Sequence, residues 1–151
     1  MPAPPHCSGT ADQREYARAL YRYLNLTRFA GRLPDDIPVR WSDRMSSTLG
    51  HMLPGVRDEQ PFVVEIALNI DLLLAGNGAE RIDTLLHEMA HAADYLFDGH
   101  AGHGRSWKAW AVRVGCRAQT RHDRPLPQRR RRGERVERVP PLPGALKQAA
   151  A

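Results

Sequence analysis

Hydrophobic positions first recur at helical spacing in the stretch that follows Thr10. Tyr16, Leu20 and Leu24 would share one face of a helix there, with polar residues on the other faces. Thr10 with Gln13 three residues later matches a capping box, in which each residue satisfies a backbone N–H of the other. The pattern therefore predicts an N-terminal helix packed on the core through its aromatic and leucine face.

A second helical pattern runs from about Asn77 to Gly99. Asn77 with Glu80 again resembles a capping box, and Gly99 could close the C-terminus. So many apolar positions predict a buried helix rather than a solvated one. The apolar positions are Ile82, Leu85, Leu86, Met89, Ala93, Leu96 and Phe97.

The intervening residues favour strands. Pro38–Ser42 reads as a short strand, Met45–Met52 as a second with Gly50 at a bulge, and Pro61–Leu68 as the clearest of the three. Asp71–Leu74 then predicts a short helix or turn. This order predicts an α+β fold, with a small antiparallel or mixed sheet packed on the N-terminal helix and the second helix.

Candidate chemistry lies within the second helix, where His87, Glu88 and His91 form the pattern H-E-x-x-H. Residues four apart lie one helical turn apart, so both imidazoles could bind one ion. Two neutral imidazoles suit Zn²⁺, and a catalytic zinc site has three protein ligands with one position left for water. Glu88 is then placed to act as the general base. The alternative, a surface helix face with two histidines, fits poorly with the apolar flanks.

The third ligand has two candidates in the glycine-rich segment after this helix, His100 and His103. Glycines there allow the reversal that would bring either histidine back over the site. Ser106 resembles the N-cap of a short helix that reaches about Val114, and a ligand just ahead of a packed helix is held firmly. His103 is therefore favoured. Asp94 could orient a ligand imidazole, but an exposed carboxylate is the simpler interpretation.

Composition is ordinary for one soluble domain of 151 residues, with 42% apolar and 26% charged residues. No apolar run is long enough to span a bilayer, and the first residues do not resemble a signal peptide. Cys7 and Cys116 alone make no disulfide framework, so we expect reduced thiols and a cytoplasmic protein without membrane contacts.

Charge divides the chain. Residues 117–151 carry a net charge of +7, whereas residues 1–116 carry −2. We therefore expect an N-terminal arm over residues 1–9, a folded domain over 10–116, and a basic, proline-rich, disordered tail over 117–151. Arg129–Arg132 in this tail could bind DNA phosphates, or the tail could simply be solvated.

Several segments, in this order, resemble the SprT-like domains of the zincin metalloproteases, which include the Spartan-type proteases. The resemblance covers roughly residues 14–116. It is carried by Leu20–Asn25, Phe29–Pro34, Val39–Ser42, Ile66–Asn69, Thr84–Ala92 and His103–Trp107.

This resemblance implies a zincin-like fold, a single zinc held by His87, His91 and His103, and Glu88 as the general base. It also implies a peptide substrate bound as an extra strand at a sheet edge, which Met45–Met52 or Phe62–Leu68 would supply. The chain departs from many members of the family because no cysteine follows Cys116, so we expect no C-terminal zinc ribbon.

Three functions fit these features. The first is a zinc-dependent endopeptidase, acting on proteins that include DNA-associated or DNA-crosslinked ones. The second is a non-enzymatic, zinc-stabilised protein that binds DNA or a DNA-bound complex through Arg129–Arg132. The third is a zinc hydrolase for another amide. Glu88 favours the first over the second, because a purely structural zinc site gains nothing from that carboxylate and would usually have a fourth protein ligand.

Overall fold

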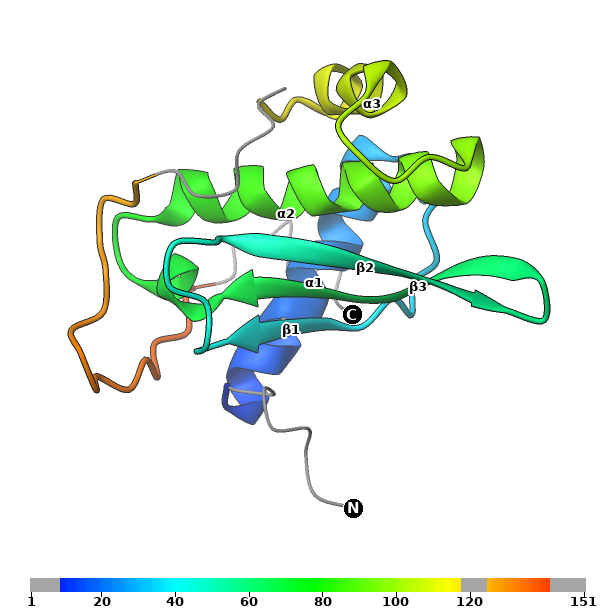
Figure 1. Ribbon diagram of the computed structural model, residues 1–151. Helices are drawn as coiled ribbons and strands as arrows, with labels where there is room; N and C mark the ends of the chain where they lie inside the picture. Colours follow the sequence, from blue (N-terminus) through cyan, green and yellow to red (C-terminus); the bar gives the residue numbers. More distant parts are fainter. Residues whose placement is uncertain (1–8, 118–124, 142–151) are drawn as a thin grey trace.

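The computed structural model describes residues 9–117 and 125–141. The expected N-terminal arm, apart from Gly9, and parts of the expected tail therefore lie outside the described residues. The chain folds in the α+β order that the sequence predicts (Figure 1). The elements are α1 (Ala11–Arg28), β1 (Val39–Ser42), β2 (Gly50–Arg57), β3 (Gln60–Asn69), η1 (Ile70–Leu73), α2 (Gly78–Ala93), η2 (Asp94–Asp98) and α3 (Arg105–Val114).

The three strands form a mixed sheet in the order β1-β3-β2. β1 pairs in parallel with β3, and β2 pairs antiparallel with β3. β3 is central, but β1 pairs with it only along residues 66–69 whereas β2 pairs with it along residues 60–68. The Phe62–Leu68 strand expected to receive a substrate is therefore paired on both sides only over its last residues. As the outer strands of the described sheet, β1 and β2 each have one edge that no strand of this sheet pairs with.

The strand expected over Met45–Met52 is also corrected. It begins at Gly50 and continues to Arg57, because the residues before it form a loop whose carbonyls bind side chains from elsewhere. The ladder irregularity lies between Leu53 and Pro54 rather than at Gly50. Proline lacks the N–H that a ladder needs, which accounts for this position.

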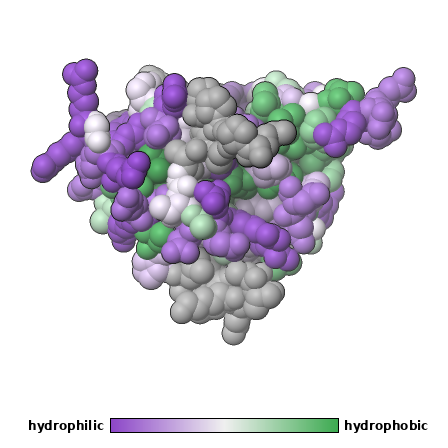
Figure 2. All heavy atoms as spheres, turned by 90° about the horizontal axis from the view of Figure 1, so that it is seen from below, coloured by the Kyte–Doolittle hydropathy of each residue, from purple (hydrophilic) through white to green (hydrophobic). Residues whose placement is uncertain are grey.

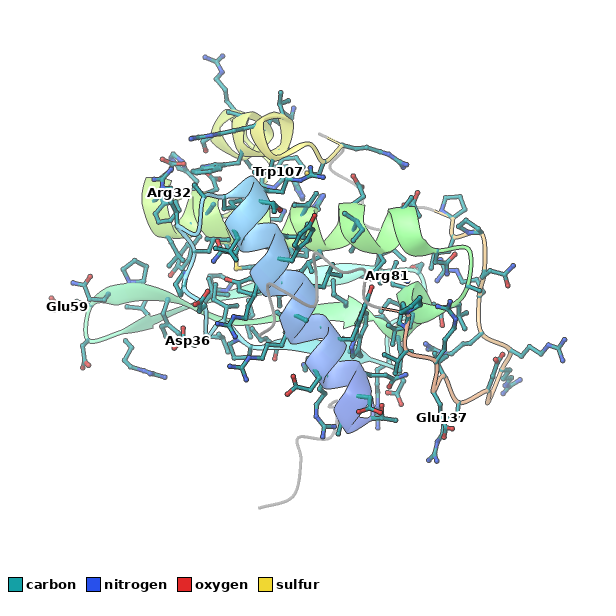
Figure 3. All side chains as sticks on the ribbon, turned by 180° about the vertical axis from the view of Figure 1, so that it is seen from behind. Arg32, Asp36, Glu59, Arg81, Trp107 and Glu137 are labelled. Atoms are coloured by element: carbon teal, nitrogen blue, oxygen red, sulfur yellow. The ribbon has the colours of Figure 1, made fainter. Side chains whose placement is uncertain are left out.

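Helix α1 covers one face of the sheet. It passes behind the strands in Figure 1 and in front of them in the reverse view of Figure 3. Thr10 and Gln13 form the predicted capping box, and the indole Nε1 of Trp41 in β1 donates to the Gln13 carbonyl over 2.9 Å. Tyr16, Leu20 and Leu24 are buried in the core, as their spacing predicts.

Helix α2 begins at Gly78, directly after the predicted N-cap Asn77, but no capping box forms there. The Asn77 amide instead donates to the carbonyls of Asp71 and Gln128, so its side chain joins three segments. One π-helical turn, η2, follows α2, and Gly99 closes it with a left-handed φ of 73°. Helix α3 then packs on the side of α2 that faces away from the strands (Figure 1).

Residues 125–141 contain no helix or strand, which agrees with their prolines. They are nevertheless packed against the domain, so the expectation of disorder is wrong for this part of the tail. The Gln13 amide donates to the Val136 carbonyl over 2.9 Å, and the Val136 side chain is buried. These are contacts between residues far apart in the sequence, which local composition does not reveal.

The face turned toward the viewer in Figure 2 is mostly hydrophilic, with smaller apolar areas between the polar side chains. Among the described residues, no helix combines the length and apolar character needed to cross a membrane.

Candidate metal centre

Three histidines converge at one side of α2. His87 and His91 lie one turn apart on the helix, and His103 returns from the loop that follows η2. The Nε2 atoms of His91 and His103 are 3.0 Å apart, and those of His103 and His87 are 3.3 Å apart. His87 and His91 are buried and His103 is half-buried. The structure therefore brings together the set that the sequence singles out, as a group that could hold a metal ion.

The spacing of these nitrogens fits a zinc ion. Zn–N bonds of about 2.0–2.1 Å at tetrahedral angles place ligand nitrogens about 3.3 Å from one another. The two observed separations lie close to this value, and imidazole nitrogen is a donor that zinc prefers. The donor set is thus suitable in number, chemistry and separation for three of the four ligands of a catalytic zinc.

Trp107 supports all three imidazoles. Its ring centroid lies 4.6 Å from that of His87, 5.0 Å from that of His91 and 4.7 Å from that of His103. The indole is fully buried, and its Nε1 donates to the His87 carbonyl over 3.4 Å. The sequence pattern includes Trp107 in the segment His103–Trp107 that resembles SprT-like domains, and assigns it no role at the site. Its place four residues after His103, in the first turn of α3, is the signal that could have linked it to the site.

His100, the other candidate for third ligand, lies outside the histidine group. Its Nδ1 is 2.9 Å from the Ser106 hydroxyl and 3.8 Å from a carboxylate oxygen of Asp94. Ser106 is not the N-cap of α3, because Gly104 holds that position and the helix begins at Arg105. The serine hydroxyl contacts His100 instead of capping the helix.

Glu88 follows His87 on α2, and its side chain is only 1% exposed. Gly50, the first residue of β2, lies directly against it. A Cβ atom on Gly50 would lie 3.2 Å from Oε2 of Glu88 and 3.1 Å from Cγ2 of Thr84. The absence of a side chain at Gly50 therefore lets the start of β2 approach Glu88 closely.

Asp94 differs from its expected exposed position, because its side chain is only 1% exposed. It is the first residue of the π-helical turn and faces the loop that carries His100 and His103. Burial raises the pKa of Asp94. The Ser106 hydroxyl and His100 lower this pKa, while the neighbouring Asp98 raises it further. Asp94, three residues after His91, is therefore a buried carboxylate rather than a surface one.

Comparison with known proteins agrees with this architecture. The model of the SprT-like family matches residues 17–130. Germ cell nuclear acidic protein of Drosophila melanogaster is 35% identical over 102 residues, which are 66% of this chain and 9% of that protein. The Homo sapiens protein of the same name is 33% identical over 99 residues, or 64% of this chain and 14% of that protein. This chain thus spans a small part of either relative, and no solved structure matches significantly.

Proposed function

Because the chain belongs to the SprT-like family, we propose that it is a zinc-dependent metalloendopeptidase that hydrolyses peptide bonds in protein substrates. The observation that carries this proposal is the convergence of the Nε2 atoms of His87, His91 and His103, together with the buried Glu88 on the helix that carries the first two. A structural zinc site would usually close with a fourth protein ligand. Within the described residues, the group of potential metal ligands contains only the three histidines.

In the proposed mechanism, His87, His91 and His103 hold the metal. A zinc ion bound there supplies Lewis-acid activation of a water molecule and of the scissile carbonyl. Glu88 takes a proton from the attacking water and later delivers it to the leaving amine. Trp107 keeps the three imidazoles in place, so that little reorganisation is needed when substrate binds.

The open edge of β2 is the proposed binding site for substrate. The backbone N–H of Asn69 donates to the backbone carbonyl of Leu49 over 2.8 Å, so the backbone groups of Leu49 point toward β3. Antiparallel ladders alternate, which directs the backbone groups of Gly50 and Met52 away from β3 and toward the open edge. An extended peptide could pair with these groups and bring its backbone past Glu88. Such pairing binds main chain and is tolerant of side-chain sequence.

We further propose that the protein substrates include DNA-associated or DNA-crosslinked proteins. Support comes from the exposed Arg131 and Arg132 and from the word "nuclear" in the names of both relatives. Arg129 and Arg130 contribute less than the sequence suggests, because both make contacts within the chain. A cytoplasmic location stays a prediction from the sequence.

The test is cleavage of a DNA-crosslinked test protein by the zinc-loaded chain, with and without additional DNA. Glu88→Gln should retain zinc and lose turnover by about 10²-fold or more, because it removes the general base and keeps the size of the side chain. Glu15→Gln, at an exposed position on α1, is the matched control and should cleave normally. Equal cleavage by Glu88→Gln and wild type would refute the assignment. The non-enzymatic alternative would be favoured by two results together. Wild type would cleave nothing, and replacement of Arg131 and Arg132 would abolish DNA binding.

A further inference from the structure

We propose that Arg130 positions the loop between β1 and β2, residues 43–49, and through it the edge strand on which substrate is proposed to bind. The inference rests on the proposed peptidase function for its link to substrate. Its structural part, the control of the loop by Arg130, stands on contacts within the chain. It assigns this arginine a role other than binding nucleic acid.

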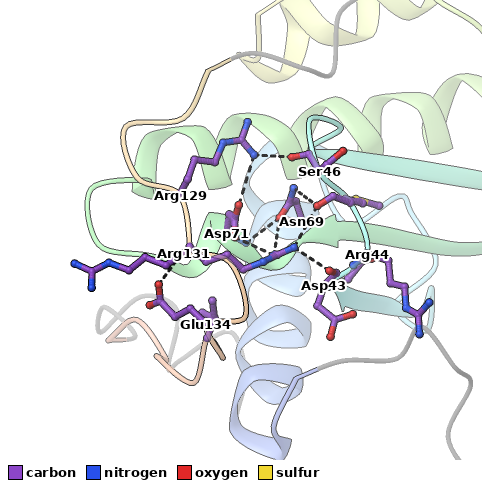
Figure 4. Close-up of polar contacts among 12 residues, drawn as sticks. Asp43, Arg44, Ser46, Asn69, Asp71, Arg129, Arg131 and Glu134 are labelled. Atoms are coloured by element: carbon purple, nitrogen blue, oxygen red, sulfur yellow. Dashed lines mark hydrogen bonds and ion pairs between the residues drawn. The ribbon is translucent and has the colours of Figure 1, made fainter.

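Asp71 is the anchor of the arrangement (Figure 4). It lies in η1, directly after β3, and only 4% of it is exposed. Nη1 of Arg130 lies 2.9 Å from one carboxylate oxygen of Asp71, and Nη1 of Arg129 lies 3.5 Å from the other. A buried carboxylate needs a compensating charge, and a planar guanidinium supplies one together with directed hydrogen bonds.

The same two guanidinium groups hold the loop. Nη2 of Arg130 donates to the carbonyl of Asp43 over 2.8 Å and to that of Met45 over 3.4 Å, while Nη1 of Arg129 donates to that of Ser46 over 2.8 Å. Most of this loop is exposed, with little apolar surface to fix it. Charged hydrogen bonds to its carbonyls therefore restrain its first half.

Asn69 holds the middle and the end of the loop. Its side-chain amide donates to the carbonyls of Met45 and Thr48. The loop then enters β2 at Leu49 and Gly50, where Gly50 lies against Glu88. Displacement of residues 43–48 would thus shift the start of the edge strand relative to the proposed general base.

The segment that carries Arg130 has further attachments, so removal of one arginine should not release it. The backbone N–H of Gln128 donates to the Asn77 side chain, and the Asn77 amide donates back to the Gln128 carbonyl. Gln13 holds the carbonyls of Val136 and Arg138. These contacts flank Arg130 on both sides in the sequence and keep the segment in place.

Arg132 supplies the matched control. It belongs to the same run of four arginines but is exposed, whereas Arg130 is half-buried. A role of the whole run as a nucleic-acid contact predicts similar effects for both residues. A positioning role predicts an effect at Arg130 alone.

The experiment compares full-length, zinc-loaded wild type with Arg130→Ala, Arg130→Lys and Arg132→Ala, in the absence of DNA. Amide hydrogen exchange should rise by at least about tenfold over residues 43–50 in Arg130→Ala and stay unchanged in the middle of α2. Arg130→Lys should be intermediate, because an ammonium group can pair with Asp71 without also reaching the loop carbonyls in the same geometry. Arg132→Ala should match wild type.

The second readout is the cleavage of an unstructured peptide. Arg130→Ala should raise KM by about three- to tenfold with a smaller change in kcat, since the arginine shapes the edge and does not touch the reacting atoms. Unchanged exchange over residues 43–50, or an equal change in Arg132→Ala, would overturn the proposal. A loosened loop with unchanged KM would overturn its link to substrate. If wild type and every variant were inactive, the proposed peptidase function would be refuted. Amide hydrogen exchange over residues 43–50 would still test the role of Arg130 in that case.

Discussion

At the scale of single residues, the candidate centre depends on which histidine completes the group begun by His87 and His91. His103 and His100 are three residues apart in the same loop, yet only His103 has its Nε2 within 3.3 Å of a helix imidazole. The Ser106 hydroxyl holds His100 on the outer side of the loop. The two histidines should therefore respond differently to replacement.

We predict that His103→Ala lowers zinc affinity by about 10²-fold or more, because one of three ligands is lost, whereas His100→Ala retains nearly full affinity. Competition with a chromophoric chelator, on folded protein, measures both affinities. Stronger loss of zinc in His100→Ala than in His103→Ala would contradict the geometry.

Asp94 gives a prediction for pH dependence. Its raised folded pKa means that the native state holds the proton more tightly than the unfolded chain. Stability is therefore lost as pH rises above the ordinary value of 3.8 and through the raised folded pKa. Asp94→Asn removes this ionisation, so the Tm of the variant minus that of wild type should increase with pH.

Thermal melts of the metal-free proteins at about pH 4.5 and about pH 8 would measure this difference. Metal-free protein is used because histidine protonation would otherwise change zinc occupancy with pH. A difference in Tm that stays constant, or that falls toward pH 8, would show that the ionisation of Asp94 does not limit stability.

At the scale of elements, the site is formed where the start of β2 meets α2. Gly50 makes this contact possible, since a Cβ there would lie within 3.1–3.2 Å of Glu88, Thr84 and the Ala67 carbonyl. Few real Cβ atoms make contacts this close, so either β2 or the glutamate must shift. The proposed mechanism is sensitive to such a shift because it needs Glu88 at a defined place.

We predict that Gly50→Ala keeps zinc and lowers kcat/KM by about 10- to 100-fold, the range that small misplacements of catalytic groups produce. Gly102→Ala is the control, because a Cβ at Gly102 would have no neighbour within 4 Å, although it adjoins His103. Both variants would be compared by zinc content and by peptide cleavage. Normal activity in Gly50→Ala would remove β2 from the proposed substrate site.

The elements themselves were largely predictable from local signals. The capping box at Thr10, the H-E-x-x-H spacing and the strand before Asn69 each depend on residues within one turn or one strand. The sequence placed β2 too early because the loop 43–49 is fixed by Asn69 and by tail arginines. The sequence around Ser106 likewise matches a helix N-cap, but the Ser106 hydroxyl contacts His100 instead of the helix backbone.

At the scale of the whole molecule, the segment 125–141 joins elements that are distant in the chain. It contacts the start of α1 through Gln13, the N-cap of α2 through Asn77, and η1 through Asp71. Prolines and a run of arginines predict an extended, polar segment, which is correct locally. Its partners could not be predicted, since each is a single polar side chain more than fifty residues away with no periodic signal.

A chain that ends at residue 117 should therefore be less stable than one that ends at residue 141. Loss of the segment exposes the surface that buries Val136 and leaves Asp71 without its arginines. We expect the Tm to fall by roughly 5–15 °C, which corresponds to about 2–3 kcal/mol at this size. Equal melting temperatures for the two chains would mean that the segment adds little to the fold.

The proposed peptidase activity depends on one zinc ion held by His87, His91 and His103. The most direct measurement is a titration of the metal-free protein with zinc, in which bound metal and peptide cleavage are followed together. Cleavage should increase in proportion to bound zinc and reach its maximum at about one equivalent per chain. Tight binding of one equivalent without any peptide cleavage, on several unstructured substrates, would contradict the proposed activity.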